Sequence, residues 1–220
     1  CSMPESSSAS PASVSFSQGL TPELLNQLTH GAGLLLSIPA AIHLISQPMD
    51  SVVWVGNLVY VFAFVLLLAA STLSHTYLTD PDREWWRTVD QCCIFLFMAA
   101  VYTPVSLHVC RDGLWNIPLI LMWVTAIAGC LAKVRVTGTE MVPVWYYLLV
   151  GFQPLICVTR LWHMGPGAIG WIAAGAACYL VGVWFLMNDH RRWYFHAIWH
   201  VLVMSGMTCQ YMLILKYTTL

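Results

Sequence analysis

The sequence is short of charge. Only 9% of its 220 residues are Asp, Glu, Lys or Arg, whereas soluble domains average about 25%. With 59% hydrophobic residues as well, the chain cannot cover itself with polar surface, which excludes a water-soluble globular protein and indicates contact with lipid. The net charge of −1 also excludes the basic surface that nucleic-acid-binding proteins use, so we expect no nucleic-acid partner.

Two further patterns are absent. The eight cysteines show no CxxC spacing, and most lie in apolar runs, where cysteine acts as a small hydrophobic residue. We therefore expect no disulfide framework. No internal repeat is evident either, which argues against a transporter built from repeats.

Residues 1–20, CSMPESSSASPASVSFSQGL, lack hydrophobic periodicity and are rich in Ser, Pro and Ala. This composition is typical of a disordered tail. The stretch also lacks a charged segment followed by an apolar one, so we do not expect a signal peptide. The predicted organisation is a tail over 1–20 and a transmembrane domain over 21–220.

Long apolar runs are what the sequence has in abundance. A helix needs about 20 residues to cross a bilayer. Seven runs reach approximately this length: 24–45, 52–74, 90–109, 114–133, 141–159, 166–187 and 195–216. Their length and uniform apolarity predict helices rather than barrel strands. We predict an all-α protein, a seven-transmembrane helical bundle that crosses the cell membrane many times.

The few basic residues are unevenly placed. Seven spans put the two ends of the chain on opposite sides of the membrane, and the side richer in Lys and Arg faces the cytoplasm. Of the nine basic residues, the N-terminal side holds Arg83, Arg87, Lys133, Arg135, Arg191 and Arg192, and the other side holds Arg111, Arg160 and Lys216. We therefore predict a cytoplasmic N-terminus and a C-terminus outside.

Ionisable residues are rare within the spans, and four exceptions share one membrane depth. His75 ends the second span, Asp90 opens the third, and His196 and His200 open the seventh. The alternating directions of the spans bring all four to the cytoplasmic side. Because such groups are costly in lipid, their coincidence indicates a functional site.

The histidines have the spacing of metal ligands. His196 and His200 are four residues apart, so they lie on one face of a helix and can bind one ion. With His75 as a third ligand, the set matches catalytic zinc sites, which keep one position open. We predict a Zn2+ site at these three residues. Asp90 is a candidate general base or an acceptor that orients a ligand histidine, and Ser71, one turn before His75, is a candidate donor to water or a substrate carbonyl.

Each candidate also has a structural interpretation. A single transmembrane histidine is usually a hydrogen-bonded packing residue, and serine often bonds a carbonyl of its own helix. An aspartate at the start of a helix, as Asp90 is expected to be, can cap that helix. His30, His43 and His108 match no cluster, and we expect the last two at the membrane interfaces.

The pattern S-x3-H, then D, then H-x3-H resembles the progestin and adipoQ receptor family and its bacterial branch, the hemolysin III-related proteins. Here it reads Ser71 to His75, Asp90, and His196 to His200. The stretches ELLNQLTHGAGLLL and AAVYTPV resemble two further family motifs through Glu23, Asn26, Thr29, His30, Gly31, Tyr102 and Pro104, with Ala100 in place of the usual glycine.

The resemblance implies a seven-helix bundle with a cytoplasmic N-terminus and zinc held by His75, His196 and His200. The wider superfamily includes alkaline ceramidases, which hydrolyse the amide of a membrane lipid. These implications favour a zinc-dependent hydrolase acting on a lipid amide or ester, with a membrane lipid as substrate or ligand. A zinc-containing receptor or sensor is the alternative. A transporter or cytolytic pore is disfavoured because no span carries a ladder of charges. The residues leave open whether the site turns over a substrate, and the oligomeric state.

Overall fold

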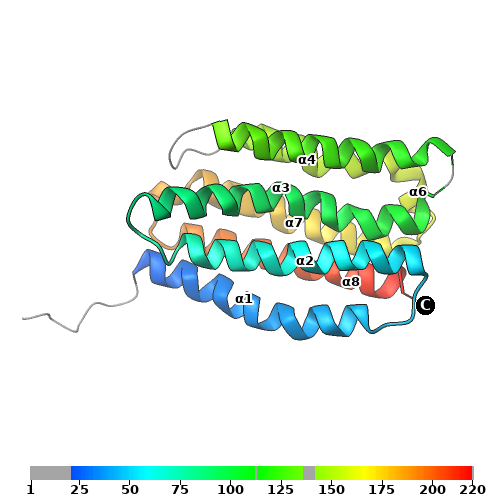
Figure 1. Cartoon of the computed structure of the whole chain (residues 1–220), viewed down its shortest axis with the longest axis horizontal. Coiled ribbons are helices and arrows are strands. Elements are labelled where there is room, and N and C mark those ends of the chain that lie inside the picture. Colours follow the sequence, from blue (N-terminus) through cyan, green and yellow to red (C-terminus); the bar gives the residue numbers. More distant parts are fainter. Residues whose placement is uncertain (1–20, 112, 136–141, 220) are drawn as a thin grey trace, which may run out of the picture.

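The computed structural model describes residues 21–111, 113–135 and 142–219; the predicted tail over 1–20 lies outside the described residues. The described residues form helices and no strand. Seven helices are long and apolar enough to cross a membrane, which confirms the predicted all-α, seven-span bundle (Figure 1). The elements are α1 Pro22–Ile45, α2 Ser51–Ser74, α3 Asp82–Val109, η1 Gly113–Asn116, α4 Ile117–Arg135, α5 Val144–Phe152, η2 Gln153–Cys157, α6 Val158–Trp162, α7 Pro166–Met187, η3 Asp189–Arg191 and α8 Phe195–Tyr217.

The first two helices begin at clear capping residues. The Thr21 hydroxyl accepts a hydrogen bond from the backbone N–H of Leu24 at 3.2 Å, and Pro22 supplies a preset φ at the first helical position of α1. The Asp50 carboxylate accepts from the N–H of Val52 at 2.9 Å. Each cap satisfies a donor that the first turn of a helix leaves unpaired.

α3 begins earlier than the apolar pattern indicates. The segment 76–89 was expected to be a connection, but the helix begins at Asp82. Asp82 and Glu84 stand in the first turn, where carboxylates favour the positive helix end, and no proline follows Pro81 until Pro104. Asp90 therefore lies about two turns inside the helix, and the interpretation of Asp90 as a helix cap is wrong.

The fifth span is not one regular helix. It runs through α5, η2 and α6 from Val144 to Trp162, later than the predicted 141–159, whose first residue lies outside the described part. Pro154 lies in the 3-10 segment η2. Because proline has no N–H and its ring displaces the preceding turn, it interrupts an α-helix at this point.

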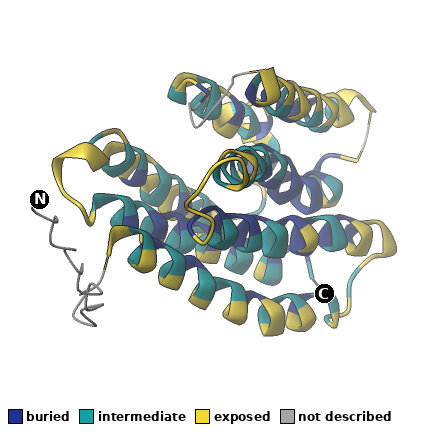
Figure 2. Ribbon diagram, turned by 60° about the vertical axis from the view of Figure 1, so that its left-hand side comes forward, coloured by how far each residue is buried: buried dark blue, intermediate teal, exposed yellow. Residues whose placement is uncertain are grey.

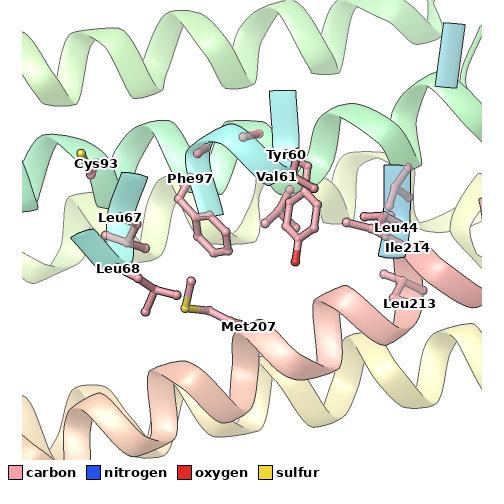
Figure 3. Packing of buried hydrophobic residues seen from close by; sticks show 14 of the residues in the cluster. Leu44, Tyr60, Val61, Leu67, Leu68, Cys93, Phe97, Met207, Leu213 and Ile214 are labelled. Carbon is pink, nitrogen blue, oxygen red and sulfur yellow. The ribbon is translucent and has the colours of Figure 1, made fainter. Parts of the chain in front are cut away.

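The helices pack as a bundle of neighbours. α3 contacts both α2 and α4, and α8 contacts both α1 and α7 (Figure 1). Buried side chains from three helices meet in the interior, among them Tyr60 of α2, Phe97 of α3 and Met207 of α8 (Figure 3). Outward residues are apolar as well: Leu35 and Leu36 are both 72% exposed. A helix that is apolar on its exposed side is suited to lipid rather than water.

Close approach of helices depends on glycine, as Gly129 and Gly182 show. A Cβ built on Gly129 of α4 would lie 2.7 Å from the ring of Phe95, and one built on Gly182 of α7 would lie 2.7 Å from the ring of Trp199. Small residues at such crossings are typical of membrane bundles, where van der Waals packing drives helix association. Figure 2 shows that the buried residues gather where the helices face one another.

Candidate metal centre

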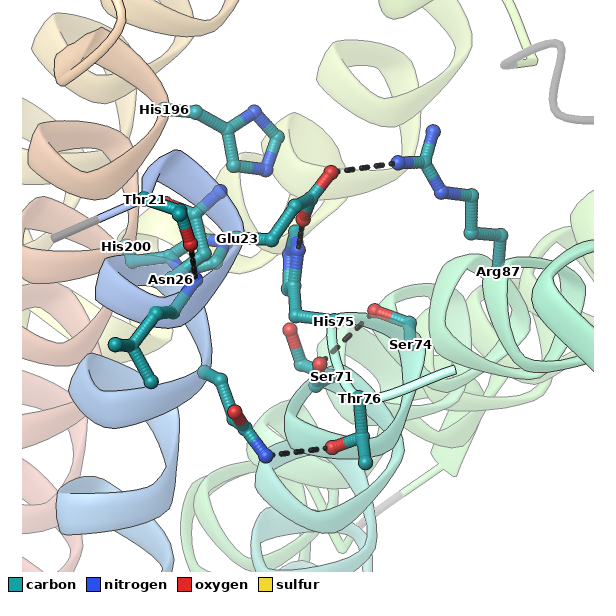
Figure 4. Close-up of polar contacts among 12 residues, drawn as sticks. Thr21, Glu23, Asn26, Ser71, Ser74, His75, Thr76, Arg87, His196 and His200 are labelled. Atoms are coloured by element: carbon teal, nitrogen blue, oxygen red, sulfur yellow. Dashed lines mark hydrogen bonds and ion pairs between the residues drawn. The ribbon is translucent and has the colours of Figure 1, made fainter. Parts of the chain in front are cut away.

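Three histidines from two helices converge at one end of the bundle. His75 follows the last residue of α2, and His196 and His200 lie in the first two turns of α8 (Figure 4). One ligand nitrogen from each of the three lies within 4.8 Å of the others. The ring centroids are 5.3 Å apart for His75 and His196, 5.0 Å for His75 and His200, and 4.8 Å for His196 and His200. The group could hold a metal ion.

The three rings are largely removed from water. His75 is 7% exposed and His200 is 2% exposed, while the side chain of His196 is 29% exposed. Polar rings buried without hydrogen bonds would be costly. Each of the three therefore needs a partner for the nitrogen that does not face the group.

A side chain from another element supplies that partner in every case. The Nδ1 of His75 lies 2.6 Å from a carboxylate oxygen of Glu23, and the Nδ1 of His196 lies 3.2 Å from Asp189. The Nδ1 of His200 lies 3.3 Å from the hydroxyl oxygen of Thr29.

These contacts assign the hydrogen on each ring. Ionised carboxylates only accept hydrogen bonds, so His75 and His196 donate from Nδ1. Thr29 gives its own hydroxyl hydrogen to the carbonyl of Asn26 at 2.8 Å, which leaves its oxygen to accept from His200. All three Nε2 atoms then keep their lone pairs for a metal, and the donor set fits such an ion.

Ser71 of α2 and Asp90 of α3 lie at the same end of the bundle as His75. Ser71 is buried at 2% exposure, one turn before His75 on α2. Asp90 of α3 is half-buried, and its carboxylate lies 3.3 Å from the Ser74 hydroxyl, which also donates to the Ser71 carbonyl at 2.9 Å. The structure therefore brings Ser71, Asp90 and the three histidines to one end of the bundle, with Ser74 as a contact that the sequence had not singled out.

His30 was expected to lie apart from the cluster, and this was wrong. Its ring stacks on that of His200 with centroids 3.8 Å apart, and the residue is 4% exposed. The physical reason is that α1 packs against α8, which a single sequence does not reveal. Glu23, Asn26 and His30 are three and four residues apart, so they form a polar stripe on an apolar helix; that stripe was the available signal.

His43 and His108 lie apart from the histidine cluster. Both are exposed, and neither belongs to the three-histidine group. His43 lies in the last turn of α1, and its backbone carbonyl accepts a hydrogen bond from the Gln47 side chain at 3.0 Å.

Comparison with known proteins places the chain among relatives. Residues 18–211 match the profile described as Haemolysin-III related. The chain belongs to this family. It is 30% identical over 207 residues to Hemolysin-3 of Bacillus cereus, covering 92% of this chain and 94% of that protein. It is 29% identical over 200 residues to the Hemolysin-3 homolog of Bacillus subtilis (strain 168), with 89% and 93% covered.

A human protein is also similar. The monocyte to macrophage differentiation factor of Homo sapiens is 27% identical over 172 residues, which cover 72% of this chain and 68% of that protein. Together with the seven candidate spans, family membership makes this chain a multi-pass membrane protein.

Proposed function

We propose that the chain is a zinc-dependent hydrolase that cleaves an amide or ester bond of a membrane lipid. The observation that carries the proposal is the convergence of three histidine nitrogens within 4.8 Å beside the Asp90 carboxylate. Three imidazoles and an open position are the ligand pattern of catalytic zinc, whereas a structural zinc is usually held by four protein ligands.

Zinc is the metal that suits this donor set. Imidazole is a ligand for zinc, copper, iron and nickel, and zinc accepts tetrahedral sites with three histidines. When bound, zinc supplies a Lewis acid that polarises a carbonyl and lowers the pKa of water.

The chain's own residues then provide the proton transfers. Asp90 takes a proton from water as general base and returns it to the leaving nitrogen or oxygen. Ser74, whose hydroxyl lies 3.3 Å from that carboxylate, holds it in place. Ser71 donates a hydrogen bond to the carbonyl oxygen of the substrate, where negative charge develops.

The surroundings of the site favour a lipid substrate. His196, His200 and Asp90 lie within helices that are apolar enough to span a membrane, and the outer faces of those helices are suited to lipid. A long-chain lipid that approaches these helices in the bilayer keeps its chains in an apolar environment. The lipid is therefore the partner we propose.

We place the centre on the cytoplasmic side, with the N-terminus in the cytoplasm. The end of the bundle that carries the three histidines also carries Arg83, Arg87, Arg191 and Arg192, because all of these lie at the start of α3 or between α7 and α8. The positive-inside rule supports this orientation.

The test is a turnover assay in lipid vesicles or mixed micelles. Purified parent protein and His200→Ala are compared on long-chain lipid amides and esters. The proposal expects release of the fatty acid by the parent and loss of that release in the variant. A zinc-containing parent that hydrolyses none of these lipids would instead favour a receptor or sensor with a structural metal.

A further inference from the structure

Two carboxylates from separate segments contact the candidate ligand histidines at the ring nitrogens that face away from the proposed metal. Glu23 belongs to the first turn of α1, and Asp189 opens the short segment η3 between α7 and α8. We infer that Glu23 and Asp189 are positioning residues, which fix the rings of His75 and His196 so that their Nε2 atoms face the metal. The inference rests on the metal site of the proposed function and adds residues to which the sequence pattern gave no role in it.

The Glu23 contact is the tighter of the two. Its carboxylate oxygen lies 2.6 Å from His75 Nδ1, and its other oxygen lies 3.6 Å from the guanidinium of Arg87 on α3. The carboxylate therefore has partners on both sides. It also stands at the N-terminal end of a capped helix, where the helix dipole favours negative charge. These restraints leave the His75 ring little freedom to turn.

The Asp189 contact is looser. Its carboxylate lies 3.2 Å from His196 Nδ1, its side chain is 42% exposed, and it has no second ion pair among the described residues. Water competes with an exposed acceptor more effectively than with a buried one. We therefore expect Asp189 to matter less than Glu23 for metal binding.

The chemistry explains why carboxylates stand at these positions. A carboxylate that accepts the N–H of a ligand histidine fixes the tautomer and the orientation of the ring, and it makes the opposite nitrogen a stronger donor. Removal of such a partner typically weakens metal binding by about 10- to 100-fold. Thr29 plays a milder version of this role at His200, since a neutral hydroxyl oxygen is a weaker acceptor than a carboxylate.

The experiment measures zinc affinity rather than turnover. The full-length protein in detergent is titrated with zinc against a chromophoric chelator, and the visible absorption of the cobalt-substituted protein reports ligand geometry. Glu23→Ala is compared with Glu23→Gln, whose amide oxygen still accepts the N–H without the charge. Asp50→Asn is the matched control, because Asp50 also forms an ion pair, with Arg111, at the other end of the bundle.

We expect Glu23→Ala to weaken zinc binding by about 10- to 100-fold and to shift the cobalt spectrum. Glu23→Gln and Asp189→Ala should lose less zinc affinity than Glu23→Ala, and Asp50→Asn should bind zinc as tightly as the parent does. Where Glu23→Ala does not fold, Glu23→Gln decides: weaker binding than the parent supports the inference, and equal binding overturns it.

Three other outcomes would overturn the inference in distinguishable ways. If the parent binds zinc and Glu23→Ala binds it equally well with an unchanged cobalt spectrum, Glu23 does not position His75, and the proposed metal site stands. If the parent binds no metal at all, the proposed function fails and the positioning role fails with it. Equal weakening by Asp50→Asn would assign the effect to general loss of stability and contradict the specific role.

Discussion

The rings of His30 and His200 lie against each other, with centroids 3.8 Å apart and planes inclined by 31°. This contact joins α1 to the helix that carries two of the three candidate ligands. His30 is nevertheless outside the group whose nitrogens lie within 4.8 Å of one another. It packs against a candidate ligand and is not itself a member of the three-histidine group.

This arrangement predicts one zinc ion per chain, held by three histidines. His200→Ala removes a ligand, so the variant should purify with almost no zinc. His30→Ala removes a ring that only packs beside the site, so it should still bind one zinc ion when zinc is in excess. Elemental analysis of the purified proteins measures both. A parent without zinc, or equal loss in the two variants, would contradict the three-ligand assignment.

Asp90 should be needed for turnover and not for folding. It lies about two turns inside α3, so it has no capping role that a substitution could disrupt. Asp90→Asn keeps the shape of the side chain and removes the charge that takes a proton. We expect a folded variant that retains zinc and loses turnover by about 10²-fold or more.

Asp82→Asn serves as the control for Asp90→Asn, because Asp82 is an exposed carboxylate in the first turn of the same helix. It should keep the parent rate. Hydrolysis by Asp90→Asn at the parent rate would show that the assigned role is wrong, even with the metal in place.

The orientation of the bundle predicts a C-terminus outside the cytoplasm. Six of the nine basic residues stand on the N-terminal side, and α8 ends at the opposite end of the bundle from the histidines (Figure 1). A reporter that is active only outside the cytoplasm, fused after residue 220, should be active. A cytoplasmic reporter at the same place should be silent, and the reverse pattern would move the metal centre to the other leaflet.

The features that the sequence predicted correctly depend on residues close together along the chain. Apolar length determined the spans, and the four-residue spacing of His196 and His200 placed both on one face of a helix. Counting the spans and their directions placed His75 at the same membrane depth as His196 and His200. The early start of α3 was not predicted, because the charged residues Asp82, Arg83, Glu84 and Arg87 interrupt the apolar pattern without preventing a helix.

The contacts that join distant segments could not be predicted in this way. Glu23 and His75 are 52 residues apart, and Asp189 lies between the predicted spans 166–187 and 195–216, where the sequence indicates no partner for it. Which helix packs beside which depends on the whole bundle, and one sequence gives no direct measure of it. The polar stripe of α1 indicated that its face needed a polar neighbour, but not that the neighbour was the metal centre.

The packing at Gly129 predicts a difference between two glycine substitutions. Gly129→Ala places a Cβ against the Phe95 ring, which is fully buried and has no room to move. We expect a loss of about 1–3 kcal/mol in the free energy of unfolding. Gly170→Ala is the control: it lies in α7 with no atom within 4 Å of the added Cβ, so it should be neutral or stabilise by about 0.5–1 kcal/mol. Unfolding in mixed micelles compares the two, and equal effects would contradict the close α3–α4 contact.

The ion pair at the other end of the bundle predicts a pH dependence. The Arg111 guanidinium, 2.5 Å from Asp50, holds the pKa of that carboxyl below its usual value, and the capped N–H of Val52 adds to this. A carboxyl with a lowered pKa in the folded state stabilises the fold above its unfolded pKa, and this contribution is lost as the pH falls through the folded pKa.

Asp50→Asn keeps an acceptor for the α2 cap and removes the titrating group. The melting temperature of the variant should therefore fall less steeply on acidification than that of the parent. Parallel curves for the two proteins below about pH 4 would show that Asp50 does not contribute to the acid sensitivity.

The most direct test of the account is hydrolysis of a long-chain lipid amide or ester by one preparation before zinc removal, after it, and after zinc is restored. The account predicts fatty-acid release by the zinc-loaded protein, loss of release in the metal-free protein, and recovery on adding zinc, with no recovery in His200→Ala. Release that continues in the metal-free protein, or no release by the zinc-loaded parent on any long-chain amide or ester, would contradict it.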